Sequence, residues 1–137
     1  FEIKIPDENY MVEADPGQLL RIFHNLLSNA VRSMKTEGGI ISVSSDIARE
    51  DKLPGISGTE KEIRKYICVN ISDTGYGIGR SRISRIFDPY YSRYRKVKGT
   101  GLGLYIVKRI IDEMSGQICV SAKKNGGTSF DIYLPGS

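Results

Sequence analysis

The feature that most constrains this chain is a broad apolar arc on one predicted helix near its start. Asp15 followed by Pro16 is a typical helix start, with a capping side chain and a first-turn proline, and the helix is predicted to run to about Met34. At about 100° per residue, one side of this helix carries Leu19, Leu20, Ile22, Phe23, Leu26, Leu27, Ala30, Val31 and Met34, which are expected to face the core. Such a face needs a large apolar partner, and a sheet is the usual one.

Shorter patterns predict the partners of this helix. Alternation of apolar and polar residues predicts strands at 1–5, 10–14, 40–45, 66–72, 117–123 and 128–134, and helical spacing predicts helices at 81–87 and 102–114. The polar segment at about 47–63 is predicted to be a flexible loop between two strands. With 137 residues, no repeat and no internal boundary, the chain is predicted to form one domain, an α/β two-layer sandwich.

The net charge of +4 conceals a local excess of basic residues. Seven of the twenty Lys and Arg residues lie between Arg80 and Lys98, with Asp88 as the only acid. This segment therefore carries +6 and the remainder of the chain carries −2. Such a stretch can be a nucleic-acid patch, a solvated face or a clamp for a small polyanion.

The composition excludes several other classes of protein. No apolar run reaches the roughly 18 residues that a membrane-spanning helix needs. The two cysteines, Cys68 and Cys119, stand singly in apolar stretches and are predicted to be small buried hydrophobes in a reducing compartment. With a single histidine besides, the chain has no cluster of zinc ligands.

Three polar residues share one margin of the long helix. Asn25, Asn29 and Arg32 stack at i, i+4 and i+7, between the apolar face and the solvent face, where His24 is placed. Asn is a poor helix former, so two of them in one helix need a reason. They are either a polar border or a row of amide oxygens for a cation, with a guanidinium for phosphate beside them.

Two glycine motifs follow later in the chain. The first, Asp73-Thr74-Gly75-Tyr76-Gly77-Ile78, comes directly after a predicted strand. It is either a simple turn or a carboxylate that accepts from an exocyclic amine such as that of adenine, with glycines against a flat ring. The second, Gly99-Thr100-Gly101-Leu102-Gly103-Leu104, opens a helix after the basic segment, where backbone N–H groups can bind an anion. Its spacing matches neither common phosphate-binding loop.

The order of these motifs resembles the ATP-binding catalytic domain of histidine protein kinases. A helix bearing Asn residues is followed by a strand and the glycine motif that Asp73 opens, then by Phe87, the basic segment, the second glycine motif and Thr128. That family belongs to a wider group with gyrase, heat-shock chaperones and mismatch-repair ATPases. The resemblance covers Asp15 to Pro135 and implies the Bergerat-type ATP-binding fold. In that fold a mixed, mainly antiparallel sheet of about five strands is covered on one face by about three helices.

The resemblance implies two cofactors, ATP and Mg²⁺, and assigns residues to each. By this likeness Asn29 coordinates Mg²⁺, Asn25 supports the same metal and Arg32 contacts phosphate, so that Asn25 and Arg32 are the implied catalytic residues. Asp73 is implied to accept a hydrogen bond from the adenine amino group. The other implied nucleotide-binding residues are Gly75, Gly77, Ile78, Phe87, Gly99, Thr100, Gly101, Leu102, Gly103, Leu104 and Thr128. The basic segment at about 80–98 is implied to be the ATP lid.

The implied function is transfer of the γ-phosphoryl group of Mg-ATP to a histidine on a separate dimerisation and phospho-acceptor domain in two-component signal transduction. The implied partners are ATP or ADP, that helical domain and, indirectly, a response regulator, with no nucleic acid and no membrane insertion. The only histidine here is His24, so the acceptor lies outside the chain. The isolated domain is expected to be a cytoplasmic monomer that does not phosphorylate itself. Its parent protein is expected to be a homodimer, either cytoplasmic or anchored to a membrane.

One position separates the competing functions, and another departs from the family pattern. Gyrase-like ATPases carry a Glu at the position of Asn25 to activate water, and an amide cannot act as that base. This favours a kinase over a superfamily ATPase, while the basic lid and the complete second glycine motif weaken an anti-sigma-type serine kinase. Ser33 stands where many members have an aromatic residue beside adenine, so weaker base stacking is expected.

Overall fold

A five-stranded sheet and two main helices make up the computed structural model, which describes residues 2–4, 11–34, 38–49, 65–91 and 102–136. The strands are β1 (Glu2–Lys4), β2 (Ile41–Arg49), β3 (Lys65–Asp73), β4 (Gln117–Ala122) and β5 (Thr128–Pro135). The helices are α1 (Pro16–Ser33), the short α2 (Arg80–Ile83) and α3 (Gly103–Glu113). No helix among the described residues is both long and apolar enough to cross a membrane.

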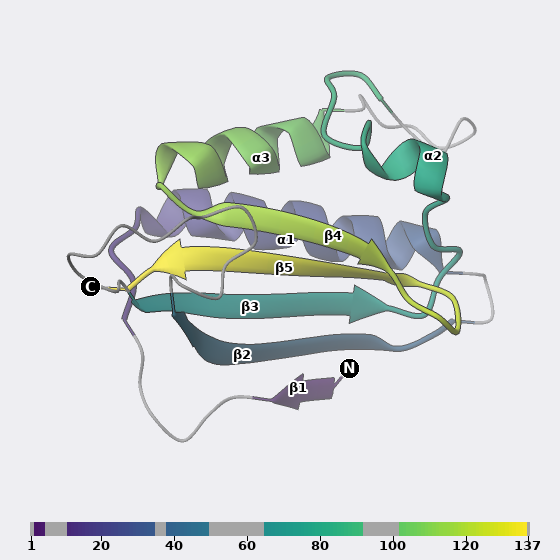
Figure 1. The fold of residues 1–137 in the computed structure, drawn as a ribbon, viewed down its shortest axis with the longest axis horizontal. Coiled ribbons are helices and arrows are strands. Elements are labelled where there is room, and N and C mark those ends of the chain that lie inside the picture. Colours follow the sequence, from purple (N-terminus) through teal and green to yellow (C-terminus); the bar gives the residue numbers. More distant parts are fainter. Residues whose placement is uncertain (1, 5–10, 35–37, 50–64, 92–101, 137) are drawn as a thin grey trace.

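The sheet has the strand order β1-β2-β3-β5-β4. β1 is parallel to β2, and the other neighbours are antiparallel. α1 and α3 lie side by side on one face of the sheet, so the structure is a two-layer sandwich (Figure 1). The predicted mixed, mainly antiparallel sheet and its helical cover are therefore confirmed.

The strand register brings three chain segments together at one end of the sheet. Ile41 at the start of β2 pairs with Asp73 at the end of β3. On the other side of β3, Ser72 pairs with Ser129, so β5 also begins here. Because α1 ends and α2 begins near the same edge, this end of the sheet collects the loops that carry the sequence motifs (Figure 1).

The core fills the space between the helices and the sheet. α1 starts as predicted, because the Asp15 carboxylate accepts the Gly17 N–H at 2.7 Å and Pro16 occupies the first turn. The buried apolar side chains from both layers include Ile22, Leu26, Ala30, Ile71, Val107, Ile110, Ile111, Phe130, Ile132 and Leu134. Alternation along β5 buries every second residue, as a sheet with one covered face requires.

The predicted apolar arc on α1 is wider than the surface that the sheet can cover. Leu20 and Val31 were expected in the core but are 69% and 56% exposed. Buried Ile22 and Leu26 mark the centre of the covered side, and Leu20 and Val31 project beyond it. The expectation that these two residues lie in the core is therefore wrong, whereas His24 is exposed as predicted.

Two predicted strands have different extents in the structure. The segment 10–14 is not a strand over its described residues: only Val12 forms an isolated bridge, with Gly136. β2 runs on to Arg49, past its predicted end and into the start of the predicted loop at 47–63. The extension follows from pairing, because Ile47 and Ala48 continue the antiparallel ladder with β3. Most of that predicted loop lies outside the described residues.

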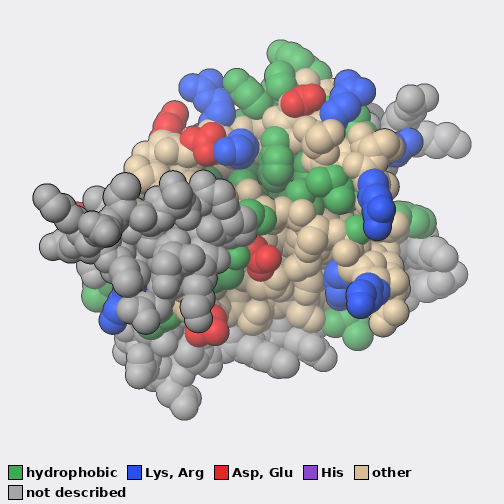
Figure 2. All heavy atoms as spheres, viewed as in Figure 1, with side chains coloured by type: hydrophobic (Ala, Val, Ile, Leu, Met, Phe, Trp, Pro, Cys, Tyr) green, Lys and Arg blue, Asp and Glu red, His purple; other side chains and the backbone are tan. Residues whose placement is uncertain are grey.

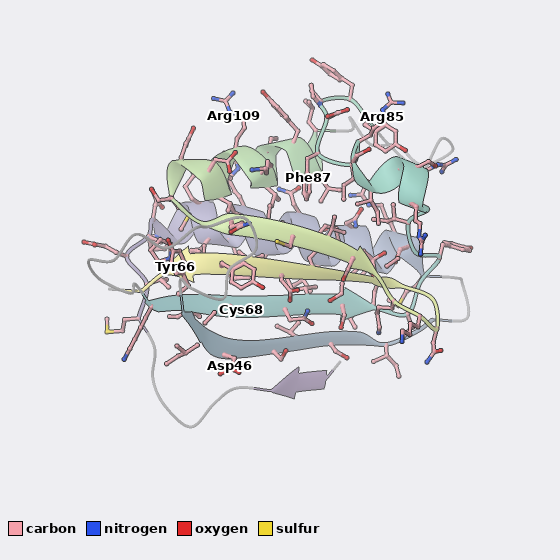
Figure 3. The ribbon with its side chains drawn as sticks, in the orientation of Figure 1. Asp46, Tyr66, Cys68, Arg85, Phe87 and Arg109 are labelled. Carbon is pink, nitrogen blue, oxygen red and sulfur yellow. The ribbon has the colours of Figure 1, made fainter. Side chains whose placement is uncertain are left out.

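Cys68 and Cys119 are free thiols on the open face of the sheet. Cys68 pairs across the strands with Asp46 (Figure 3) and with Tyr133. Cys119 pairs with Asp131. Each thiol is half-buried rather than fully buried, because α1 and α3 cover only the opposite face. Burial, followed by the Asp131 charge, raises the pKa of Cys68 to about 11.

The raised pKa of Cys68 predicts a loss of stability at alkaline pH. An unfolded thiol ionises near its ordinary pKa of 9.0, whereas the folded thiol, with a pKa of about 11, keeps its proton longer. The folded state therefore binds more protons in this window, and its stability is complete below about pH 9 and falls as the pH rises toward about 11. Because the thiol is half-buried, the loss is about 1 kcal/mol. Urea unfolding at about pH 8 and pH 10 should show a smaller loss for Cys68→Ala, and an equal loss would contradict this assignment.

Candidate nucleotide-binding site

Asp73 is a buried carboxylate at the end of β3. It is 2% exposed, and its Oδ1 accepts the backbone N–H of Gly75 at 2.9 Å. Its neighbour Thr74 forms two hydrogen bonds with Ile40, which precedes β2. A buried carboxylate requires hydrogen-bond donors, and a ligand amine can be one of them.

Two glycines allow the backbone segments around Asp73 to approach closely. A Cβ on Gly127 would overlap the carbonyl oxygen of Asp73, and the φ of Gly127 is +97°. A Cβ on Gly75 would overlap the Oγ of Ser33. Gly77 lies against the backbone of Gly127, with a φ of +74°. Only glycine meets these requirements without strain, so the first glycine motif and the β4–β5 turn form one packed unit.

Ser33 joins the end of α1 to the first glycine motif. It is fully buried, its Oγ donates to the Ala30 carbonyl at 2.7 Å, and its own carbonyl accepts the Tyr76 N–H at 3.0 Å. A larger side chain at this position would meet Gly75. The family resemblance leads one to expect an aromatic side chain at position 33. In the structure Ser33 instead packs against the loop that follows Asp73.

The polar margin of α1 meets the start of α3. Asn25 donates from Nδ2 to the Arg21 carbonyl at 2.9 Å. Its Oδ1 lies 3.1 Å from the point that a Cβ on Gly103 would occupy. The helix that carries the Asn residues and the helix that the second glycine motif opens are therefore in contact at Asn25 and Gly103.

Two buried polar atoms near these loops have no hydrogen-bond partner among the described residues. Asn29 is 8% exposed with an unpartnered Nδ2, and Thr128 is fully buried with an unpartnered Oγ1. Thr128 begins β5 beside the end of β3, next to the pair Ser72–Ser129. Buried polar groups are nearly always satisfied, so unpartnered ones at predicted site residues are consistent with a polar ligand.

The donor set fits a nucleotide with a divalent cation. Asp73 can accept from an amine, while Gly75, Gly77 and Gly127 let the neighbouring segments pack closely around it. The amide of Asn29 offers an oxygen for Mg²⁺, which keeps phosphate oxygens and waters as its other ligands. The first turn of α3 presents backbone N–H groups that suit phosphate.

Some predicted site residues play a packing role or lie elsewhere. Ile78 is buried in the core, and half-buried Phe87 and Leu104 pack against it, while Leu102 is half-buried just before α3. Arg32 is exposed and its Nε donates to the Ser28 carbonyl at 3.4 Å, so the structure does not bring it onto the Asn29 amide. The predicted residues Gly99, Thr100 and Gly101 lie outside the described residues.

Part of the predicted lid is visible at this end of the molecule. Lys and Arg side chains gather on the right of Figure 2, at the end where α2 and the β4–β5 turn lie. Arg85 pairs with Asp88 at 3.8 Å and lies 5.1 Å from the ring centre of Tyr91, and it points away from the sheet (Figure 3). Residues 92–98 of the predicted lid lie outside the described part of the chain.

Comparison with known proteins identifies the family. The family described as "Histidine kinase-, DNA gyrase B-, and HSP90-like ATPase" matches residues 14–137. The chain is 37% identical over 135 residues to hybrid signal transduction histidine kinase A of Dictyostelium discoideum, covering 95% of this chain and 6% of that protein. It is 30% identical over 139 residues to sensor histidine kinase WalK of Bacillus subtilis, covering 98% and 20%.

A solved structure agrees with these sequence relatives. The catalytic domain of histidine kinase ThkA matches 97% of this chain and 77% of that chain, with 28% identity and a TM-score of 0.73. The chain spans at most about a fifth of the two relatives named above. Fold, motif order and relatives agree, and the chain belongs to the histidine kinase-, DNA gyrase B- and HSP90-like ATPase family as a histidine-kinase-type ATP-binding catalytic domain.

Proposed function

We propose that this domain binds Mg-ATP at the end of the sheet where Asp73 lies and donates the γ-phosphoryl group to a histidine on a separate domain. The acceptor would be a helical dimerisation and phospho-acceptor domain of the same parent protein, in two-component signalling. The observation that carries the proposal is that the strand register sets the buried carboxylate of Asp73 beside Thr128, whose buried Oγ1 has no partner among the described residues. On α1, Asn29 is also buried, and its Nδ2 has no partner there. These are the positions that the family resemblance assigns to adenine and metal.

The proposed roles follow from the contacts of each residue. Asp73 accepts a hydrogen bond from the adenine amino group, and Thr128 supports that end of the base. Asn29 supplies an amide oxygen to Mg²⁺, and Asn25 holds the same region through its contact with Gly103. When bound, Mg²⁺ neutralises phosphate charge during phosphoryl transfer. The first turn of α3 binds phosphate, and Arg32 would turn from its contact with the Ser28 carbonyl to reach it.

Asn25 favours a kinase over a water-activating ATPase. Hydrolysis needs a group that can accept a proton from water, and an amide does not titrate. Asn25 also uses its Nδ2 within α1 and places its Oδ1 against the start of α3. In this position the Asn25 side chain can stabilise the region that holds the nucleotide and the metal. The sequence relatives, which are histidine kinases, support the same choice.

In the proposed reaction, the acceptor histidine comes from another part of the parent protein. The matched relatives are far longer than this domain. We expect the acceptor domain elsewhere in a homodimeric parent, with a response regulator receiving the phosphoryl group from that acceptor. We also propose that the domain works in the cytoplasm, whether or not its parent protein is anchored to a membrane.

Incubation with γ-labelled ATP tests this proposal. The domain alone is expected to show little turnover and no self-labelling, because it has neither a hydrolytic Glu at position 25 nor an acceptor His. Adding the helical domain of the parent should give label on that domain, and the bond should be acid-labile and base-stable. The same helical domain with its acceptor His replaced by Ala is the control. Rapid phosphate release by the domain alone would instead support the ATPase, and label on His24 would contradict the proposed acceptor.

Replacing Asp73 with Asn is expected to weaken adenine nucleotide binding by about 2 kcal/mol, roughly 30-fold, because a hydrogen bond to a charged group is lost. The wild-type domain should bind GTP poorly, since the guanine carbonyl would face the carboxylate. Titration calorimetry with ATP and GTP measures both effects. Asp46→Asn, at an exposed carboxylate on the open face of the sheet, is the matched control. Equal wild-type affinities for ATP and GTP would remove Asp73 from this role.

A further inference from the structure

Thr74 links the loop after β3 to the connection between α1 and β2. Its N–H donates to the Ile40 carbonyl at 3.2 Å, and its Oγ1 accepts the Ile40 N–H at 3.0 Å. These bonds extend the β2–β3 ladder one residue beyond the pair Ile41–Asp73. Thr74 is itself exposed, so its side chain contributes little to the core. What the side chain does contribute is the hydrogen bond of its hydroxyl with Ile40.

The surroundings of Thr74 are shaped to keep this contact. A Cβ on Gly39 would lie 2.7 Å from the Thr74 Oγ1 and 2.5 Å from the Met34 Sδ, so the hydroxyl fits only because position 39 has no side chain. On its other side, Thr74 is followed by Gly75, whose N–H donates to the Asp73 carboxylate at 2.9 Å. Thr74 therefore stands between the residue that carries the carboxylate and the residue that orients it.

We propose that Thr74 is a positioning residue for adenine recognition, acting through Asp73; this rests on the proposed function above. Its two bonds to Ile40 hold Thr74 at both its N–H and its side chain, and Thr74 supplies the carbonyl of the next peptide, whose Gly75 N–H bonds to the Asp73 carboxylate. Without the hydroxyl, this residue keeps only its backbone bond to Ile40, and the Asp73 carboxylate loses part of its fixed orientation. The effect is confined to the base, because the Asn29 amide and the first turn of α3 lie on other elements.

Thr74→Val and Thr74→Ser test the proposal in the folded domain. Valine has nearly the shape of threonine without the hydroxyl, whereas serine keeps the hydroxyl. Titration with Mg-ATP should show a loss of about three- to tenfold for Thr74→Val, the value of one hydrogen bond, and wild-type affinity for Thr74→Ser. The unfolding temperature of Thr74→Val should stay within a few degrees of wild type, because Thr74 is exposed.

Gly39→Ala perturbs the same contact by a different route. The added methyl group would displace the Thr74 Oγ1, so a similar loss of ATP affinity is expected. Gly79→Ala is the matched control, because a Cβ on Gly79 has no atom within 4 Å and its φ is negative. That control should bind Mg-ATP as the wild type does.

A double-mutant cycle with Asp73→Asn separates positioning from a structural role. If Thr74 acts through Asp73, Thr74→Val should cost no further ATP affinity once Asp73 has become Asn. Additive losses, wild-type affinity in Thr74→Val, or failure of serine to rescue would each overturn the proposal. Failure of the wild-type domain to bind Mg-ATP would contradict the proposed function itself, and so the two failures are distinguishable.

Discussion

Replacing Asn29 with Ala is expected to abolish the Mg²⁺ dependence of nucleotide binding. Asn29 is buried one turn after Asn25 on α1, and its Nδ2 has no hydrogen-bond partner among the described residues. Mg²⁺ binds through few protein oxygens together with phosphates and water, so loss of the proposed protein ligand should remove the metal's contribution. The ratio of ATP affinities with Mg²⁺ and with a chelator should fall to about one in Asn29→Ala.

Asn29→Asp is the matched control for this experiment. It keeps the size of the side chain and an oxygen ligand, so nucleotide binding should still depend on Mg²⁺. Asn25→Ala should weaken nucleotide binding less than Asn29→Ala and phosphotransfer more, because Asn25 already uses its Nδ2 within α1. An undiminished Mg²⁺ dependence in a folded Asn29→Ala domain would place the metal elsewhere.

Replacing Gly127 with Ala is expected to destabilise the domain by about 3 kcal/mol and to weaken ATP binding with it. The added Cβ would overlap the carbonyl oxygen of Asp73, which belongs to the β3 backbone and cannot rotate away. The φ of +97° adds backbone strain for any other residue. Relief requires β3 and the β4–β5 turn to separate, and this moves Asp73. Urea unfolding and ATP titration measure the two effects.

Gly126→Ala separates clash from strain. Gly126 also has a positive φ, of +90°, but a Cβ there would have only the Gly75 carbonyl oxygen near it, at 3.8 Å. The cost should therefore be about 1 kcal/mol, with ATP binding nearly unchanged. If Gly126→Ala and Gly127→Ala were equally destabilising, the close approach of Gly127 to Asp73 would not be the cause.

Sequence periodicity predicted the main elements but not the extent of their burial. Its strand at 10–14 is wrong, because only an isolated bridge forms over its described residues, and its helix at 81–87 is wrong in extent, because α2 ends at Ile83. The helix that starts at Pro16, the strand that ends in Asp73 and the helix before Gly116 all follow from local patterns. The exposure of Leu20 and Val31 does not, because a helical wheel shows which side is apolar but not how much of that side a sheet will cover. Tertiary packing sets that limit.

The residues of the candidate site also fall into two groups, those that the sequence motifs identify and those that only the fold reveals. Asn29, Asp73 and Thr128 could be chosen from motif order, and the structure places them in buried positions consistent with a ligand. Thr74 and Ser33 were not chosen, because their roles depend on partners brought close by the fold. The Thr74 hydroxyl meets the N–H of a residue 34 positions earlier. The close approach of position 39 to this hydroxyl is likewise visible only in the structure.

Thermal unfolding with and without Mg-ATP is the most direct test of the central claim that the sheet end around Asp73 is a Mg-ATP site. A ligand that binds only the native state stabilises it by mass action, so the midpoint should rise with millimolar Mg-ATP. The rise should be larger than with Mg-GTP and clearly smaller in Asp73→Asn. No rise in the folded wild-type domain, or an equal rise in Asp73→Asn, would contradict the assignment.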